Sequence, residues 1–289
     1  IARKCRVVYL DDIMIFGKDP DEHYENLRQV LEILSKEKLY AKLSKCAFNQ
    51  IEIQFLGHLV GRQGIKVNPK KVEAVEKWPT PKDVKQVRQF LGLTNYFRRF
   101  IKGYSTIAAP LMDMVKHGVD VKTAWKEPQE KSFEQLKKAL TTAPVLVLPD
   151  FEKPFEVVSD ASLVGTGAVL LQDGRVVGYT SKKFSEAEKR YTTTEQELLG
   201  VVHAMKEWRC YLEGTEDVTL VTDHNPLKYL TDKPELTRRL ARWMDFLAPY
   251  KFKWEYRKGR NNVADPLSRS PLLEIATVLL AWSIPGIPE

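Results

Sequence analysis

The run PFEVVSDASLVGTGAVLLQDGRVVGYTSKKF, residues 154–184, decides the fold of this sequence. Three apolar, β-branched segments follow one another in it, and Asp173-Gly174 separates the second from the third. Asp-Gly between two such segments is a strong signal for a two-residue hairpin, because the favoured turns need positive φ angles. The run therefore predicts one strand followed by a β-hairpin.

Helices and strands alternate from there to about residue 270. We expect a long helix over 194–212, a fourth strand in VTLVTD, a helix near 235–248, a fifth strand in KFKWEYR and a short helix beginning near Asn262. Five strands with helices between them indicate an α/β unit over residues 145–270.

Four carboxylates stand in separate elements of this unit: Asp160, Glu197, Asp223 and Asp265. Each lies at a predicted strand end or in the first turn of a predicted helix, where acids of different elements can converge. Converging acids without a His or Cys cluster favour hard cations such as Mg²⁺, with Mn²⁺ as a substitute. Two such ions can clamp the attacking water and the leaving oxygen of a phosphodiester.

These acids also have ordinary structural explanations. Asp160 at a strand end is typical of a turn, and Asp265 in a first helical turn favours the helix dipole. Glu197 falls on the helix face predicted to be buried, where an acid needs a partner such as a metal. Glu195 is its rival, on a mixed face, and we interpret His224 as substrate-side or structural.

Composition restricts the function classes. The 289 residues, 43% of them hydrophobic, suffice for about two domains. The net charge of +7 favours a polyanionic partner without requiring one. Three widely spaced cysteines, Cys5, Cys46 and Cys210, argue against a disulfide framework and a zinc site and favour a reducing compartment.

No segment has the features of a secretion signal or a membrane anchor. No signal peptide is visible, and the apolar run at 272–282 is shorter than the roughly 20 residues that span a bilayer. We therefore expect an intracellular protein, in a cytoplasmic particle or the nucleus, that is not secreted and has no membrane partner.

The first 145 residues have a different pattern. RVVYLDDIMIF, residues 6–16, predicts a hairpin whose two runs are joined by Asp11-Asp12, although such turns favour Gly or Asn. A helix and several short strands should follow. Asn68-Pro69 and Thr80-Pro81 predict two helix starts, the second with an acid three residues after the threonine, and a further helix should cover 128–141.

Basic residues gather at three places along the chain. A solvated basic surface is the ordinary explanation for such clusters, and contact with a nucleic-acid backbone is the sharper one. The candidates for nucleic-acid binding are Arg98, Arg99, Lys102, Lys182, Lys183, Arg238, Arg239 and Arg242.

Several multi-residue blocks point to a family. They are YLDDIMIF (9–16), FLGHLV (55–60), GIKVNPKKVEAVEKWPTP (64–81), VRQFLGLTNYFRRFI (87–101), TEQELLGVVHAMKEWRCYL (194–212) and GRNNVADPLSRS (259–270). Together with VVSDAS and VTDHNPL, they resemble, in order, the palm end, thumb and ribonuclease H region of a gypsy-type LTR-retrotransposon polyprotein. The resemblance covers about residues 5–270.

The resemblance implies an α/β (α+β) fold in several parts. The C-terminal part of a reverse transcriptase palm would occupy 1–66, and thumb or connection helices 67–144. A ribonuclease H domain, a five-stranded mixed sheet with flanking helices, would occupy 145–270, and a tail 271–289.

The resemblance also implies an activity, which is Mg²⁺-dependent hydrolysis of the RNA strand of RNA/DNA hybrids by a reverse transcriptase. Asp160, Glu197, Asp223 and Asp265 would hold the metals, and Asp11 and Asp12 would belong to a polymerase site that acts on template-primer in a longer parent chain. A degenerate, non-catalytic nucleic-acid-binding remnant is the alternative. The sequence does not decide whether the chain forms a homodimer.

Residues 1–289 alone should extend no primer at any Mg²⁺ concentration. The family's palm has a further metal-binding Asp and template-holding fingers, which would lie before Ile1, and misplacement by about 1 Å can cost about a hundredfold in rate. Template-dependent dNTP incorporation measures this, with a longer chain that includes the fingers as the positive control. Incorporation by residues 1–289 would contradict the expectation.

Overall fold

A computed structural model describes residues 6–116, 119–224, 227 and 236–257 of the chain. They divide into two compact units that meet in sequence at Asn68 and Pro69. Within the described residues, no helix is both long and apolar enough to cross a membrane.

The first unit begins with the predicted hairpin. Strands β1 (Arg6–Tyr9) and β2 (Asp12–Ile15) pair antiparallel, with Tyr9 opposite Asp12. The prediction that Asp11 and Asp12 form the turn is wrong by one residue, because Leu10 and Asp11 make it and Asp12 opens the second strand. Leu10 adopts the positive φ of 51° that the sharp reversal requires.

The rest of the first unit is one helix and a small sheet. Helix α1 (Pro20–Lys36) begins at the N-cap Asp19, whose side chain accepts a hydrogen bond from the Glu22 amide. A 3₁₀ turn, η1 (Leu43–Lys45), leads to the antiparallel strands β3 (Glu52–Phe55), β4 (His58–Gly61) and β5 (Gly64–Val67). These pairings are between neighbours in sequence.

The second unit starts with helices. They are α2 (Pro69–Glu76), α3 (Val84–Tyr96), the 3₁₀ turn η2 (Arg98–Phe100), α4 (Tyr104–Met114), α5 (Val121–Ala124) and α6 (Glu127–Thr141). The buried rings of Phe90 on α3 and Phe133 on α6 pack with their centroids 4.6 Å apart. The predicted helix over 128–141 is confirmed, with its apolar residues in this helical core.

The start of α3 corrects a prediction. Thr80-Pro81 does not begin a helix. Asp83 is the N-cap, and its carboxylate accepts a 2.8 Å hydrogen bond from the Gln86 amide. The acid that was expected inside the first turn therefore caps a helix that begins three residues later, because Asp is among the strongest N-cap residues.

A five-stranded mixed sheet follows, with strand order β10-β9-β6-β7-β8. Strands β6 (Phe155–Ala161), β7 (Gly165–Gln172) and β8 (Arg175–Lys183) form the predicted antiparallel run. Asp173 and Gly174 turn between β7 and β8 with φ of 51° and 70°, which confirms the hairpin. Strands β9 (Val218–Thr222) and β10 (Phe252–Tyr256) join parallel to β6.

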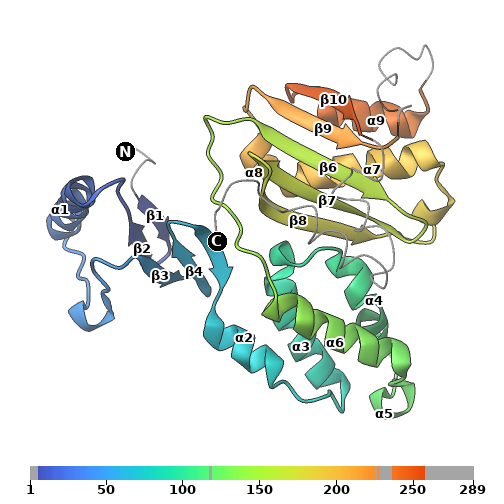
Figure 1. Cartoon of the computed structure of the whole chain (residues 1–289), viewed down its shortest axis with the longest axis horizontal. Helices are drawn as coiled ribbons and strands as arrows, with labels where there is room; N and C mark the ends of the chain where they lie inside the picture. Colours follow the sequence, from blue (N-terminus) through green and yellow to red (C-terminus); the bar gives the residue numbers. More distant parts are fainter. Residues whose placement is uncertain (1–5, 117–118, 225–226, 228–235, 258–289) are drawn as a thin grey trace, which may run out of the picture. The chain divides into compact units, whose positions relative to one another are not determined.

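Helices cover one face of this sheet (Figure 1). A 3₁₀ turn, η3 (Glu188–Arg190), precedes α7 (Thr193–Glu207), α8 (Arg209–Leu212) and α9 (Arg238–Leu247). The single helix expected over 194–212 is interrupted at Trp208, whose buried ring joins the core. Leu198, Val201 and Met205 of α7 pack on the apolar residues of β6 and β7.

The helical region, residues 69–141, forms hydrogen bonds with the edge strand β8. The Ser105 amide donates to the Ser181 hydroxyl at 2.9 Å, and the Ser105 hydroxyl donates to the Ser181 carbonyl at 2.7 Å. Arg99 donates to the carbonyl of Val177 at 3.3 Å. An edge strand with unpaired backbone groups invites pairing with another chain, and these contacts satisfy some of those groups.

Replacing Asp83 with Ala should lower the free energy of unfolding by about 1 kcal/mol, because the first turn of α3 loses its cap. Urea denaturation monitored by tryptophan fluorescence measures the change. Thr80→Ala is the matched control and should change stability by less than about 0.5 kcal/mol. The reverse ranking would place the helix start at Thr80 after all.

Candidate active site

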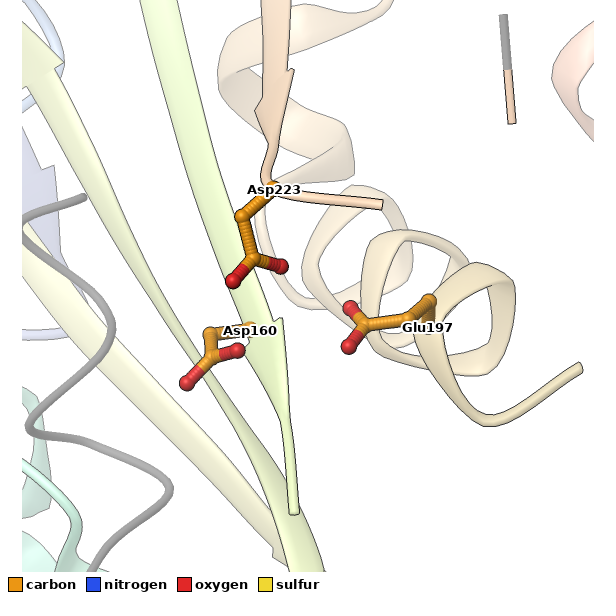
Figure 2. Close-up of side chains that lie close together, drawn as sticks. All are labelled: Asp160, Glu197 and Asp223. Carbon is orange, nitrogen blue, oxygen red and sulfur yellow. The ribbon is translucent and has the colours of Figure 1, made fainter. Parts of the chain in front are cut away.

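Three of the four predicted acids meet at one end of the sheet. Asp160 is near the end of β6, and Asp223 directly follows β9. Because β6 and β9 are parallel neighbours, their carboxyl ends lie side by side. Glu197 enters from the second turn of α7, and Figure 2 shows the three carboxyl groups pointing toward one another.

The distances suit a metal ion. One carboxylate oxygen from each of Asp160, Glu197 and Asp223 lies within 4.8 Å of the other two. Asp160 and Glu197 are buried, with 3% and 5% of their surface exposed, and Asp223 is half-buried. Within the described residues, this triad is the one group of three or more metal-binding side chains that the geometry brings together.

Glu197 is the most perturbed member. Burial, followed by repulsion from Asp160 and Asp223, raises its pKa to about 9, although the Ala161 amide stabilises the charged form. Its Oε2 atom is buried without a hydrogen-bond partner in the described structure. A divalent cation would supply both the missing partner and the positive charge, so the donor set fits a hard metal ion.

The close packing of α7 on the sheet brings Glu197 next to Asp160 and Asp223. Gly200 follows Glu197 by one helical turn. A Cβ atom on it would lie 2.3 Å from Thr166 Oγ1 and 2.7 Å from Ser159 Oγ, too close for any side chain without movement of both neighbours. The missing side chain therefore lets α7 pack directly against β6 and β7.

The structure does not test the roles predicted for the other acids. Asp265 and the helix expected near Asn262 lie outside the described residues. Asp11 and Asp12 are exposed on the hairpin of the first unit. Their assignment to a polymerase site stays a prediction.

Several of the predicted nucleic-acid contacts make ion pairs within the chain. Arg98 pairs with Glu207 of α7 at 2.7 Å, Lys183 with Asp113 of α4 at 3.5 Å, and Lys182 with Glu188. Arg99 is half-buried at its hydrogen bond to β8, and Lys102 is half-buried. On α9, Arg238 and Arg242 are exposed, whereas Arg239 pairs with Glu195 at 2.7 Å.

Sequence reasoning missed the role of Glu195. It is 8% exposed and is not on a mixed surface face. With Thr192 it forms a capping box, in which each side chain accepts a hydrogen bond from the other residue's amide. The spacing Thr192-x-x-Glu195 is the sequence signature of that motif and could have revealed the role.

His224 also has a structural contact. Its Nε2 lies 2.9 Å from the hydroxyl of Thr194, in the first turn of α7. The contact joins the segment after β9 to the helix that carries Glu197. The structural interpretation of His224 fits this geometry.

Two family descriptions match the sequence. Residues 150–250 match an RNase H-like domain found in reverse transcriptase, and residues 2–60 match a reverse transcriptase, an RNA-dependent DNA polymerase. The first match contains all three acids of the triad, and the second contains the hairpin with Asp11 and Asp12.

Curated relatives extend over nearly the whole chain. The Pol polyproteins of transposons 297 and gypsy from Drosophila melanogaster are 42% and 34% identical over 95% and 94% of the chain. The transposon Tf2-3 polyprotein of Schizosaccharomyces pombe is 38% identical over 93%. The chain spans 26%, 27% and 21% of these three relatives, respectively.

Solved structures share the fold. The foamy viral protease-reverse transcriptase in complex with an RNA/DNA hybrid superposes with a TM-score of 0.78 over 92% of this chain and 37% of its own, at 24% identity. The corresponding complex with double-stranded DNA, described as dRH, gives a TM-score of 0.76 over 88% of this chain and 46% of its own. At this identity, the similarity establishes the ribonuclease H-like arrangement of the sheet and helices.

Glu197 should make the stability of the metal-free protein depend on pH. A carboxyl group whose folded-state pKa is raised stabilises the fold below its unfolded pKa, near 4.5, and loses that contribution as pH rises through about 9. Glu197→Gln removes this loss, so the variant should gain stability relative to the parent between pH 5 and 9. Thermal unfolding in EDTA measures the difference.

Glu186→Gln is the control for this experiment. Its hydrogen bond to Lys189 lowers the pKa of Glu186, so that carboxylate is ionised throughout the same range. The control should shift the curve by a constant amount. A constant offset for Glu197→Gln would contradict the raised pKa.

Proposed function

The chain belongs to the gypsy-type retrotransposon Pol family, and on that premise we propose that its RNase H-like domain hydrolyses the RNA strand of RNA/DNA hybrids with Mg²⁺. The observation that carries the proposal is the buried triad of Asp160, Glu197 and Asp223, whose oxygens lie within 4.8 Å of one another. A buried carboxylate oxygen without a hydrogen-bond partner calls for an explanation, and a bound cation supplies one.

The three acids act as ligands in this proposal. Asp160 and Asp223 extend from neighbouring strand ends, and Glu197 closes the third side from α7. We assign the fourth ligand position to Asp265 by the resemblance. Mg²⁺ or Mn²⁺ ions held by these residues would supply the charge that activates a water molecule and stabilises the leaving 3′ oxygen.

The acids hold this geometry before substrate arrives. The capping box fixes the first turn of α7, and Gly200 sets the depth at which the helix packs. Such preorganisation matters because phosphodiester hydrolysis depends on positioning the reacting groups. A bound metal ion would also stabilise the ionised form of Glu197, which burial disfavours.

The hybrid would be recognised mainly through its backbone and groove shape. The foamy viral relative was solved with an RNA/DNA hybrid. On this chain, exposed Arg238 and Arg242 are the phosphate contacts best supported by the structure, because their side chains are on the exposed face of α9. Contacts with phosphates do not read sequence, so discrimination would rest on shape and 2′-hydroxyls.

The parent polyprotein would also polymerise DNA on template-primer. We propose that Asp11 and Asp12 contribute to that site in the longer chain, on the strength of the match over residues 2–60. We keep the sequence-based boundaries at 66, 144 and 270 as proposed functional divisions. The nuclease assignment does not depend on the polymerase assignment.

Asp160→Asn and Asp223→Asn should each abolish Mg²⁺-dependent cleavage of a labelled hybrid. Loss of roughly 4 kcal/mol of transition-state stabilisation corresponds to about a thousandfold slower cleavage. Hybrid binding, measured in EDTA, should change little. Gel analysis of cleavage products should show 5′ phosphates for the parent.

Asp217→Asn is the matched control, since Asp217 precedes β9 at the end of the strand opposite Asp223. Its exposed carboxylate pairs with Lys253 at 3.3 Å, and its loss should leave cleavage within about twofold. Parental cleavage by Asp160→Asn would disprove the site. A parent that binds hybrids without cleaving them would favour the degenerate, non-catalytic alternative.

A further inference from the structure

Helix α9 is fastened to the beginning of α7 by a partly buried ion pair. Arg239 Nη1 lies 2.7 Å from Glu195 Oε1, and the Glu195 side chain is only 10% exposed. The guanidinium carbon of Arg239 also lies 3.8 Å from the ring centre of Tyr191, in cation–π geometry. Tyr191 directly precedes Thr192, the N-cap of α7.

Both members of this pair have further partners within the protein. Glu195 accepts hydrogen bonds from the amide and hydroxyl of Thr192 as well as from Arg239. Arg239 has one face against Tyr191 and one end on Glu195. The positive charge of Arg239 is therefore balanced by Glu195 within the protein.

The same side of α9 continues into the core. Trp243, one turn after Arg239, packs against Tyr191 with ring centres 6.1 Å apart, and Leu240 and Leu247 are buried in the main core. Arg238 and Arg242 are four residues apart and exposed, so they share the solvent-facing side of the helix, away from Leu240 and Leu247, and Arg239 lies between that side and the core.

The anchor lies next to the candidate active site in sequence and in space. Glu195 precedes the triad residue Glu197 by two positions in the first turns of α7. A shift of α9 relative to this turn would change the distance between the exposed arginines and the acidic triad. The pair therefore couples the proposed binding surface to the proposed catalytic centre.

We propose that Arg239 is a positioning residue, which through Glu195 and Tyr191 fixes α9 so that Arg238 and Arg242 meet the hybrid backbone in register with the triad. This inference rests on the proposed function. It divides the three arginines of α9 into one internal anchor and two phosphate contacts, whereas the sequence presents them as a single basic ridge.

Salt dependence of hybrid binding distinguishes the two roles. In EDTA, Arg238→Ala and Arg242→Ala should each reduce the slope of log affinity against log salt by about one unit, as expected for a lost phosphate contact. Arg239→Ala should weaken binding by about tenfold at every salt concentration and leave the slope unchanged, since the coupling of contacting residues is of that order.

Glu195→Gln gives the sharper test because the two explanations predict opposite signs. Removing a negative charge near a polyanion should strengthen binding if only charge matters. If Glu195 anchors α9, the variant should weaken binding about as much as Arg239→Ala, and the double variant should be no weaker than either single variant. The amide of Gln can still complete the capping box, so the helix start is retained.

Glu213→Gln is the matched control for charge. Glu213 pairs with Arg209 on the surface, with both side chains more than half exposed, and its loss should leave affinity within about twofold. In steady-state cleavage, Arg239→Ala and Glu195→Gln should raise KM with kcat within a few-fold of the parent. Asp160→Asn instead loses kcat, so a failed nuclease assignment is recognised separately.

Hydrogen exchange of the α9 amides tests the anchor without nucleic acid. Exchange should accelerate equally in Arg239→Ala, Glu195→Gln and the double variant, and not in Glu213→Gln. Unchanged exchange, a slope reduced by one unit in Arg239→Ala, or tighter binding by Glu195→Gln would each overturn the proposal. A parent that binds no hybrid would contradict the proposed function, and exchange would still decide whether the pair anchors α9.

Discussion

The close approach of three carboxyl groups at one end of the sheet is the constraint that the packing of the second unit has to satisfy. Burial, followed by repulsion from Asp160 and Asp223, disfavours the charged form of Glu197. The parallel pairing of β6 and β9 and the tight packing of α7 hold the three groups together. The fold thereby stores an unfavourable interaction that a bound cation would relieve, which is typical of functional sites.

Several arginines and lysines form ion pairs with glutamates around the helix that carries Glu197. Arg98, Lys182 and Arg239 each pair with a glutamate of α7 or of the turn before it, and the Arg98 side chain is itself exposed. The pairs of Arg98 and Arg239 join the helical region and α9 to α7, the helix that carries Glu197, and the pair of Lys182 joins β8 to the turn before α7.

Local sequence was a sufficient guide wherever one element determines its own shape. The Asp173-Gly174 hairpin, the five strands and the helix over 128–141 were predicted because turn chemistry and hydrophobic periodicity act over a few residues. Two helix boundaries were predicted wrongly. Asp83 rather than Thr80 caps α3, and the helix expected over 194–212 is interrupted at Trp208, whose ring is part of the core.

The order of the elements, the family and the candidate acids can be read from the sequence, since motif spacing and residue type are properties of the chain. Which charges pair can be read only from the folded structure. Glu195 and Arg239 are separated by 44 residues, so no local pattern could show that they meet. Charged side chains interact through space with any partner that folding brings within a few ångströms, and that distance is set by how α7 and α9 pack on the sheet.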